Sequence, residues 1–221
     1  MMRGCFEAET ALYEFIPDHV PRPIAFGTHK LRPDTHFYMC QFVDMLDDVP
    51  DPRGWATAVT NLHSRSMGKS PCGQFGFSVD THLANVPVDN TWASSWEVFF
   101  AQQMRSLLNK EETLHGPDAE YKQLKDEFFD IVIPRFLRPL ETEGRSITPC
   151  LVHSDLWPGN IKPSLDSDAV CMFDSCAYWG HNEGPLFHTS PRRRETAHFV
   201  CRSGLGHLPQ PSLPPRQVVY Q

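Results

Sequence analysis

The chain has 221 residues, of which 40% are hydrophobic and 21% are charged, so it has the composition of a globular protein and is not wholly disordered. Its formal net charge of −7 argues against a nucleic-acid partner, which would require a basic surface. Apolar runs are too short for a membrane-spanning helix, and the seven cysteines include no Cys-x-x-Cys pair, so we expect a cytoplasmic protein with reduced thiols and no membrane partner.

The first part of the chain alternates helical and extended patterns. Apolar residues at helical spacing predict a helix over residues 7–16, and closely spaced prolines predict an extended segment over residues 20–24. Residues 36–43 have the length and apolar character of a strand, and an acidic turn follows them. Residues 55–63 repeat apolar side chains with the period of a helix.

Two longer helices are expected next. Asn90 or Thr91 can cap a helix whose aromatic stripe begins at Trp92, and Asp118 can open another helix that is kinked or ended near Pro134. We expect these aromatic stripes to form core, because the burial of large apolar faces is the main drive to fold.

The composition changes sharply after residue 184. Residues 185–221 contain six prolines and five arginines against one glutamate, and the periodic pattern is lost. We therefore expect residues 1–184 to form the folded part and residues 185–221 to be a Pro/Arg-rich tail without packed structure.

The residues that can carry chemistry gather late in the folded part. A His-x-Asp sequence ending at Asp155 is followed by Asn160, and an apolar strand over residues 169–173 leads to Asp174. Phosphoryl transfer needs such a set: one carboxylate orients the acceptor hydroxyl and takes its proton, while carboxylate and amide oxygens hold the metal ions that neutralise the donor phosphates. The simpler alternative is that Asp155 caps a turn and His153 lies in the core.

These motifs resemble those of the fructosamine and ketosamine kinases, which are relatives of the aminoglycoside phosphotransferases. HSDLWPGN (153–160) is similar to the family's His-Gly-Asp-Leu-Trp-x-Gly-Asn, and FDSCAYWGHNE (173–183) is similar to its Asp-Pro and Tyr-Gly-His-x-Glu motifs. Upstream, FEAE (6–9) and VPRPI (20–24) resemble the family's Phe-Glu-Gly-Glu and Val-Pro-Lys-Pro-Ile. The motifs keep a consistent order along the chain.

The resemblance implies an α+β, protein-kinase-like fold with two lobes. Residues 1–46 would be the remnant of a truncated N-lobe with its hinge, and residues 47–184 would be a mostly helical C-lobe. The family continues beyond both limits, so we expect a truncated or misspliced gene model, or a decayed copy.

The resemblance also implies roles for individual residues. Asp155 would be the catalytic base, and Asn160 and Asp174 would bind Mg²⁺. Glu9 would stand where the family has a helix glutamate that pairs with a phosphate-gripping lysine, although no lysine precedes Lys30 and a solvated carboxylate is an equal alternative. The hinge residues expected to meet the adenine of ATP through backbone groups are Gln41, Phe42, Val43, Asp44 and Met45.

The sequence departs from the family pattern at several positions. Ser154 replaces the glycine before the base, Pro158 lies inside the loop, and Ser175 replaces the proline of the Asp-Pro motif. Serine enters positive φ less easily than glycine, so we expect a strained or slightly re-aimed loop. His181 and Glu183 match the family motif, and a structural role for them is at least as well supported as substrate contact.

The function implied by the resemblance is ATP-dependent phosphorylation, with Mg²⁺, of the 3-hydroxyl of ketosamines. The substrates would be ribulosamine or fructosamine on glycated protein lysines, or small ketosamines. Because the phosphate-clamping lysine is not found, we expect this chain to be weakly active or inactive. Two alternatives stay open: a non-catalytic kinase-like fragment or binding module, and a phosphotransferase for a small amine such as an aminoglycoside.

Overall fold

The computed structural model describes residues 1–167 and 169–184, so the tail predicted for residues 185–221 lies outside the described residues. The helices are α1 (Met2–Phe15), α2 (Pro52–Ser66), α3 (Trp96–His115), α4 (Ala119–Glu127), a π-helical turn η1 (Phe128–Val132), α5 (Ile133–Leu137) and a 3-10 turn η2 (Arg138–Glu141). No helix in these two ranges combines the length and the hydropathy needed to cross a membrane.

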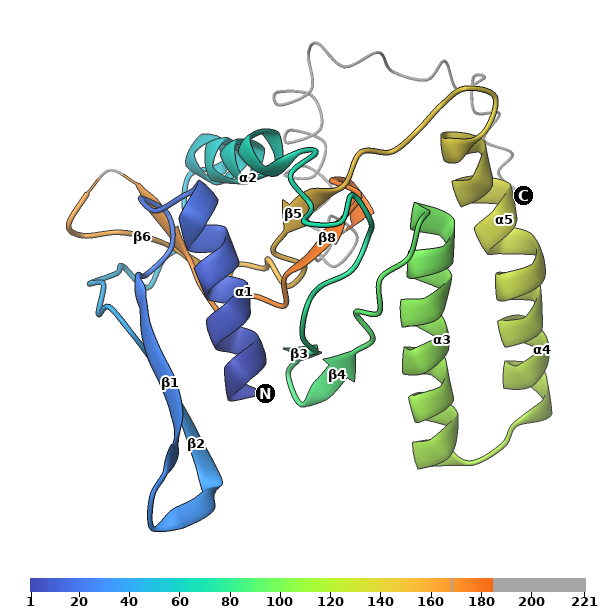
Figure 1. The fold of residues 1–221 in the computed structure, drawn as a ribbon, viewed down its shortest axis with the longest axis horizontal. Coiled ribbons are helices and arrows are strands. Elements are labelled where there is room, and N and C mark those ends of the chain that lie inside the picture. The colour runs from blue at the N-terminus through green and yellow to red at the C-terminus, as the bar shows by residue number, and fades with distance from the viewer. Residues whose placement is uncertain (168, 185–221) are drawn as a thin grey trace.

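The strands of the described residues form antiparallel pairs (Figure 1). The pairs are β1 (Pro23–His29) with β2 (Arg32–Cys40), β3 (Thr81–Leu83) with β4 (Val86–Val88), β5 (Cys150–Val152) with β8 (Tyr178–Gly180), and β6 (Ile161–Pro163) with β7 (Val170–Met172). The strands on either side of the chemistry-bearing loop, β5 and β6, therefore belong to different pairs.

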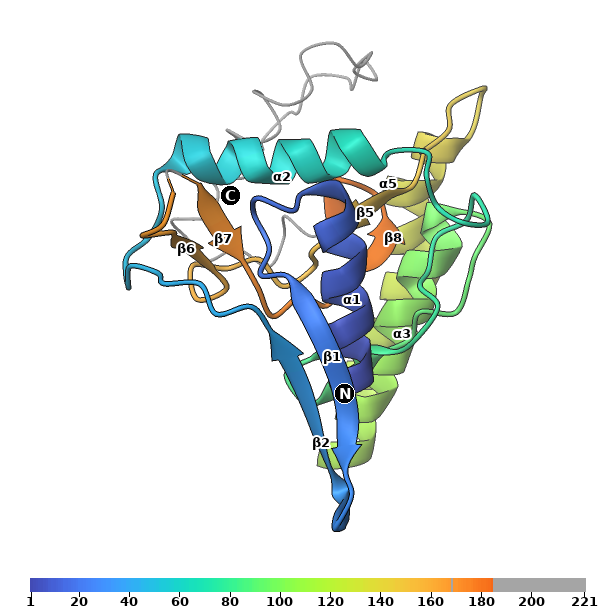
Figure 2. The same cartoon turned by 60° about the vertical axis from the view of Figure 1, so that its left-hand side comes forward.

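Helix α1 lies between the long β1–β2 hairpin and the centre of the molecule (Figures 1 and 2). Its buried positions Gly4, Ala8 and Leu12 are spaced four residues apart and face the core. On another side of the helix, the ring of Phe6 lies 5.5 Å from that of Phe26 in β1. The helix predicted over residues 7–16 is confirmed and begins earlier.

The strand predicted over residues 36–43 is shifted in the structure. It begins at Arg32 and ends at Cys40, because it pairs with β1, which the sequence indicated only as an extended segment. One further backbone hydrogen bond follows the β1–β2 pair: the Gln41 N–H donates to the Arg22 carbonyl at 2.8 Å. The residues after Gln41 no longer pair with β1.

Helix α2 crosses the top of the molecule in Figure 2 and packs on β5 and β7. Asp51 caps it by accepting hydrogen bonds from the N–H groups of Arg53 and Gly54 at 3.0 and 3.3 Å. Pro52 occupies the first turn, where an N–H has no partner within the helix. The helix predicted over residues 55–63 is confirmed.

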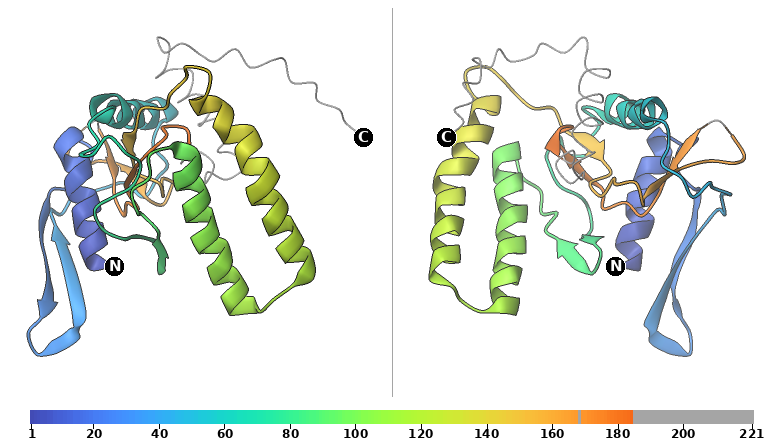
Figure 3. Two further views of the ribbon diagram at one scale, coloured as in Figure 1. Left: turned by 45° about the vertical axis from the view of Figure 1, so that its right-hand side comes forward. Right: turned by 180° about the vertical axis from the view of Figure 1, so that it is seen from behind.

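Helix α3 runs antiparallel to the segment from α4 to α5 (Figure 3). The cap predicted for it was wrong: Ser95, and neither Asn90 nor Thr91, caps the helix by accepting from the Val98 N–H at 3.3 Å. Because α3 begins at Trp96, later than predicted, its N-terminus lies beside η2. Here the Glu141 carboxylate of η2 also accepts from the first N–H groups of α3.

The residues before α3 are held as extended chain. Ala93 exchanges two backbone hydrogen bonds with Phe75, at 2.8 and 2.9 Å. The buried Asn90 amide donates to the Thr81 hydroxyl at 2.8 Å. These contacts prevent the helix from extending back, so Trp92 lies outside it.

The second long helix begins as predicted and is interrupted at the predicted proline. Asp118 caps α4 by accepting from the Tyr121 N–H at 2.7 Å. The α-helical pattern stops at Glu127, a π-helical turn follows, and α5 resumes at Ile133. Pro134 has no N–H for the regular helical bond, and the wider turn accommodates that loss.

Of the two stripes predicted to be core, that of α3 is confirmed, whereas that of the second helix is wrong: α4 has no buried residue, and Leu124 is 59% exposed. Trp96 is 2% exposed and Phe99 is fully buried. The Trp96 ring lies 5.8 Å from Phe75 and 5.9 Å from Phe99, whose ring lies 5.2 Å from Tyr178 in β8. Helix α3 thus packs directly against the β5–β8 pair, of which β5 comes before the chemistry-bearing loop and β8 after it.

A buried hydroxyl joins α2 to β5. Ser66 donates to the Leu62 carbonyl at 2.6 Å and accepts from the Leu151 N–H at 2.9 Å. All three residues are almost completely buried.

Replacing Ser66 tests this link. We expect Ser66→Ala to reduce the free energy of unfolding by about 1–3 kcal/mol, because the buried Leu151 N–H loses its partner. Urea denaturation measures the change. Ser64→Ala is the matched control, since Ser64 is exposed in the same helix and the gain in helix propensity is shared; equal stabilities of the two variants would contradict the role given to Ser66.

Histidines with lowered pKa values predict acid sensitivity. Desolvation lowers the pKa of the buried His63 and His153 and of the partly exposed His181 from 6.5 to about 4. The unfolded chain therefore binds more protons than the folded chain between these values, and stability falls as the pH drops from about 6.5 to about 4. Burial raises the pKa of Glu9 to about 7, and this acts in the opposite direction above 4.5.

We expect His63→Gln to shrink the stability difference between pH 7 and pH 5 by about 1–2 kcal/mol, because it removes one such titration. Thermal or urea unfolding at both pH values measures this. His115→Gln, at an exposed position of α3, is the control. A pH dependence that His63→Gln leaves unchanged would show that folding does not lower the pKa of His63.

Candidate active site

The chemistry-bearing loop, residues 153–160, is fastened to the chain that follows β7. The Phe173 N–H donates to the Asn160 carbonyl at 3.1 Å, and the Cys176 N–H donates to the His153 carbonyl at 3.0 Å. The His153 Nε2 lies 3.1 Å from the Phe173 carbonyl, which can only accept, so this nitrogen carries a proton. Burial lowers the pKa of His153 to about 4, so the ring is neutral and its place is structural.

Asn160 links the segments that carry the two predicted carboxylates. Its side-chain nitrogen lies 3.2 Å from Asp155 Oδ2, 2.9 Å from the Asp155 carbonyl and 3.5 Å from the Asp174 carbonyl. Asn160 is buried, Asp155 is half-buried and Asp174 is exposed. Because the nitrogen faces these acceptors, the amide oxygen is directed away from them. The predicted base and metal ligands therefore lie at one place, and their roles stay predictions.

Two residues of the site have a left-handed backbone conformation. Ser154 has a φ of +64° and Asp174 has a φ of +58°. A β-carbon makes this region unfavourable, so the strain expected from the replacement of glycine by Ser154 is present in the structure. Burial raises the pKa of the Tyr178 hydroxyl, and a hydrogen bond with the Ser154 side chain opposes that rise. The departure from glycine is thus accommodated by a contact with β8.

Trp157 and Gly159 shape the outer side of the loop. A Cβ on Gly159 would lie 2.2 Å from the Trp157 ring, so only glycine permits this packing. Trp157 is 45% exposed. An exposed indole two residues after Asp155 offers a ligand both an apolar face and an N–H donor.

Glu9 reaches the site from α1. It is 2% exposed, and its Oε1 accepts from the Ser175 N–H at 2.8 Å. Its Oε2 is buried and has no hydrogen-bond partner within residues 1–167 and 169–184. Burial raises the pKa of Glu9 to about 7, and the Ser175 N–H counteracts this. The alternative of a solvated carboxylate is therefore wrong.

The predicted hinge follows β2 and runs beside the β6–β7 pair. Gln41 still bonds to Arg22, whereas Met45 forms an isolated bridge with Ser164. The Asp44 carbonyl accepts from the chain after β6 at 2.9 Å.

Phe42 and Val43 lie between these two anchored points. Neither residue uses its backbone N–H or carbonyl in a hydrogen bond to another described residue. Phe42 is 87% exposed, and Val43 is partly exposed. Unpaired backbone groups in an extended, accessible segment suit a planar ligand with alternating donors and acceptors.

The donor set fits magnesium in part. Carboxylate and amide oxygens are the ligands that Mg²⁺ prefers, and Asp174 with the Asn160 oxygen supplies them. Within the described chain, however, no group of three or more His, Cys, Asp or Glu side chains could hold a metal. Magnesium commonly completes such a site with water and substrate phosphates, so the residues fit an ion that arrives with a nucleotide.

The pKa of the buried Cys176 thiol is affected by the charges of the site. Burial raises its pKa to about 12, and the nearby Asp155 and Asp174 carboxylates contribute to the rise. Its sulfur donates to the Thr81 hydroxyl at 3.4 Å. Cys176 is therefore a protonated packing residue, not a nucleophile.

Sequence reasoning missed two contributors to the site. Ser175 was noted only as a departure from proline, yet its N–H binds Glu9; the signal was that serine restores a donor that proline lacks. Gly76 has a φ of +143°, and it exchanges backbone hydrogen bonds of 2.8 and 3.0 Å with Trp179 of β8. The partly exposed His181 packs against the core, with its ring 5.9 Å from that of Trp96.

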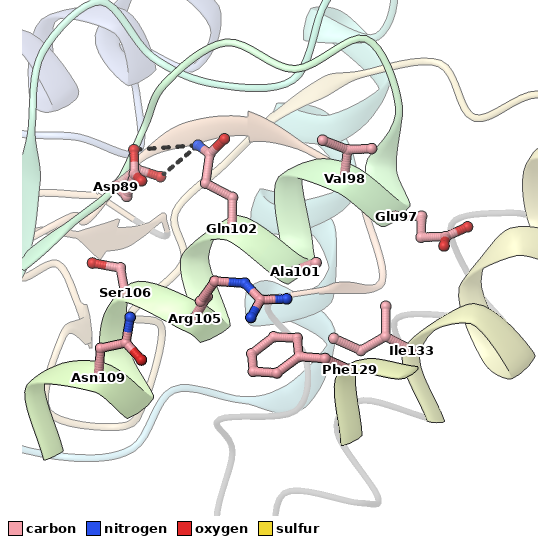
Figure 4. Close-up of a pocket in the computed structure, with 10 residues that line it drawn as sticks. All are labelled: Asp89, Glu97, Val98, Ala101, Gln102, Arg105, Ser106, Asn109, Phe129 and Ile133. Atoms are coloured by element: carbon pink, nitrogen blue, oxygen red, sulfur yellow. Dashed lines mark hydrogen bonds between the residues drawn. The ribbon is translucent and has the colours of Figure 1, made fainter. Parts of the chain in front are cut away.

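A groove of about 590 Å³ lies elsewhere, between α3 and the segment from η1 to α5 (Figure 4). Its charged groups are engaged: the Arg105 guanidinium lies 4.0 Å from the centre of the Phe129 ring, and Asp89 accepts from Gln102 at 3.2 Å. Loop 153–160 does not line it. The groove is therefore separate from the candidate active site.

Curated relatives support the family indicated by the motifs. The chain is 28% identical over 182 residues to "Protein-ribulosamine 3-kinase, chloroplastic" of Oryza sativa subsp. indica, covering 80% of this chain and 50% of that protein. It is 30% identical over 183 residues to the protein of the same name from Arabidopsis thaliana, covering 80% and 52%. It is 35% identical over 114 residues to "Ketosamine-3-kinase" of Mus musculus, covering 51% and 34%. The chain spans about half the length of the first two relatives.

Solved structures support the predicted fold. A protein described as a fructosamine-3-kinase from Thermobifida fusca YX-ER1 superimposes with a TM-score of 0.69 at 20% identity, covering 94% of this chain and 67% of that chain. A similarly described protein from Haemophilus somnus 129PT gives 0.59 at 20% identity, covering 90% and 65%. The α+β, protein-kinase-like fold is therefore confirmed. The sequence profile described as "Fructosamine kinase" matches residues 2–190, and this chain belongs to the fructosamine kinase family.

Proposed function

We propose that the site of Asp155, Asn160 and Asp174 transfers the γ-phosphate of ATP to the 3-hydroxyl of a ketosamine. The acceptor would be ribulosamine or fructosamine on a glycated protein lysine, or a small ketosamine. The observation that carries this proposal is the Asn160 nitrogen, which lies within 3.5 Å of both the Asp155 and the Asp174 segments. Phosphoryl transfer depends on such fixed relative positions.

Asp155 would act on the acceptor. Its carboxylate would accept a hydrogen bond from the sugar hydroxyl, direct the oxygen toward the donor phosphate, and take the proton as the new bond forms. The Asn160 N–H bond to Oδ2 supports this role, because it limits the rotation of the carboxylate. The exposed Trp157 would contact the apolar face of the sugar or its lysine stem.

Asp174 and the Asn160 oxygen would hold Mg²⁺, which would neutralise charge on the donor phosphates when bound. The adenine would meet the backbone of the hinge, Gln41 to Met45, where Phe42 and Val43 have unused groups. The free Oε2 of Glu9 would accept from a cationic side chain that grips the phosphates.

We also propose that residues 1–46 act as an N-lobe remnant with its hinge and residues 47–184 as the C-lobe. The β1–β2 hairpin with α1 on one side and the α3–α5 helices on the other support this division (Figure 3). The six free cysteines of the described residues support a reducing compartment such as the cytosol.

Two substitutions separate the proposed base from the proposed metal ligand. We expect Asp155→Asn to lower phosphorylation of a ribulosamine- or fructosamine-lysine peptide about 10²–10⁴-fold, because general-base catalysis is lost. Mg-ATP affinity should change little. Asp174→Asn should weaken Mg-ATP binding at least about tenfold as well, because it removes charge that the ion needs. Phosphate transfer from labelled ATP and calorimetry measure the two quantities.

Asp166→Asn provides the control, since Asp166 is an exposed carboxylate on the loop between β6 and β7. It should leave both quantities unchanged. Full transfer by Asp155→Asn would remove Asp155 as the base, and unchanged Mg-ATP affinity in Asp174→Asn would remove Asp174 as a ligand.

A non-catalytic binding module is the second candidate. It is favoured by the buried Glu9 Oε2, which no cation of the described residues contacts. Arg3, the nearest upstream cation in sequence, pairs with Glu7 at 3.8 Å instead. The lack of a cation from the described residues at Glu9 Oε2 would also make this chain weakly active.

This observation predicts weak nucleotide binding. We expect a Mg-ATP dissociation constant near or above about 1 mM, equivalent to only about 4 kcal/mol. Calorimetry on the full 221-residue chain measures it. Micromolar binding would contradict the expectation and would favour the kinase over the module.

A further inference from the structure

Successive peptide groups around Asp174 form hydrogen bonds to other parts of the chain. The Phe173 N–H donates to Asn160 and its carbonyl accepts from His153, while the Asp174 carbonyl lies 3.5 Å from the Asn160 nitrogen. The Cys176 N–H donates to His153. These partners all belong to the loop 153–160, so they fix Asp174 relative to Asp155 only.

Two peptide groups in this series act on Glu9, a residue from another part of the molecule: those of Ser175 and Asp174, both of which oppose the rise that burial causes in the pKa of Glu9. The Ser175 N–H donates to Glu9 Oε1 at 2.8 Å, which joins residues 166 positions apart. Glu9 is 2% exposed on α1, and the chain leaving β7 passes α1 in Figure 2. A hydrogen bond to a carboxylate inside the protein is stronger than one in water. This bond is therefore the tie between α1 and the Asp174 segment.

The tie requires a residue with an N–H after Asp174. A proline at this position would have no N–H and could not donate to Glu9. Asp174 has a φ of +58°, an unfavourable conformation that persists only where its surroundings hold it. Ser175 thus supplies a restraint at the residue that needs one.

We propose that Glu9 and the backbone of Ser175 are positioning residues for Asp174: the buried Glu9 carboxyl holds the peptide that follows Asp174 and so couples the placement of α1 to the direction of the Asp174 carboxylate. The inference rests on the proposed function for the role of Asp174 as a metal ligand. It differs from the role proposed for Glu9 Oε2, because it uses the other oxygen and needs no external cation.

Four variants of the full chain test the tie in matched pairs. Ser175→Pro removes the N–H, whereas Ser175→Ala keeps it and removes only the hydroxyl. Glu9→Leu removes the acceptor, whereas Glu9→Gln keeps an acceptor oxygen without the charge. Circular dichroism and thermal unfolding establish that each variant is folded before the comparison.

The first readout is amide hydrogen exchange at Cys176 and, where it exists, Ser175, measured by NMR. We expect Glu9→Leu to speed exchange at Ser175 at least about tenfold, which corresponds to about 1.4 kcal/mol. Glu9→Gln should stay within about threefold of the unmodified chain. Equal exchange in Glu9→Leu and Glu9→Gln would overturn the tie.

The second readout is the affinity for Mn²⁺ with ATP, followed by electron paramagnetic resonance. Ser175→Pro and Glu9→Leu should bind about tenfold more weakly than Ser175→Ala and Glu9→Gln, respectively. Unchanged affinity, with faster exchange, would overturn the positioning role. If the unmodified chain binds no Mn²⁺ while its Ser175 amide is protected by Glu9, the metal role of Asp174 fails and the tie stands. If Glu9→Leu does not fold, the Ser175 pair alone decides.

Discussion

The Asn160 side-chain nitrogen is the atom on which the geometry of the site depends. It can donate two hydrogens, and three oxygens from two separate segments lie within 3.5 Å of it. The Phe173 N–H binds the carbonyl of the same residue, so side chain and backbone act together. The loop runs into β6, whose ladder with β7 places Asn160 beside the chain that leads to Asp174, and the Asn160 side chain extends this link to Asp155.

The surroundings of this atom are buried, and that burial sets the chemistry of every titratable group nearby. His153 becomes a neutral hydrogen-bond donor and Cys176 a protonated thiol, and the pKa of the Glu9 carboxyl rises to about 7. Asp155 and Asp174, by contrast, keep access to solvent. Burial therefore distinguishes two sets of residues: desolvated groups with structural roles, and exposed carboxylates that can contact a ligand.

The sequence predicted the helices and the loop well because their signals are local. Asp118 as a cap, the buried face of α1 and the spacing from Asp155 to Asn160 all depend on neighbours along the chain. The errors have a long-range cause: α3 starts late because Ala93 pairs with Phe75, and β2 is shifted because its partner β1 was not recognised as a strand. The Glu9–Ser175 bond joins distant residues, so no periodicity could indicate it.

The exposure of Trp157 gives the loop an optical property of its own. Trp55, Trp96 and Trp179 are 6%, 2% and 5% exposed and Trp92 is partly buried, whereas Trp157 is 45% exposed and rests on Gly159. Emission from a hydrated indole lies at longer wavelength than emission from a buried one, and a dissolved quencher reaches it first. The red edge of the protein's fluorescence therefore comes mainly from the loop that carries Asp155, and a molecule that covers the loop shifts that edge toward the blue.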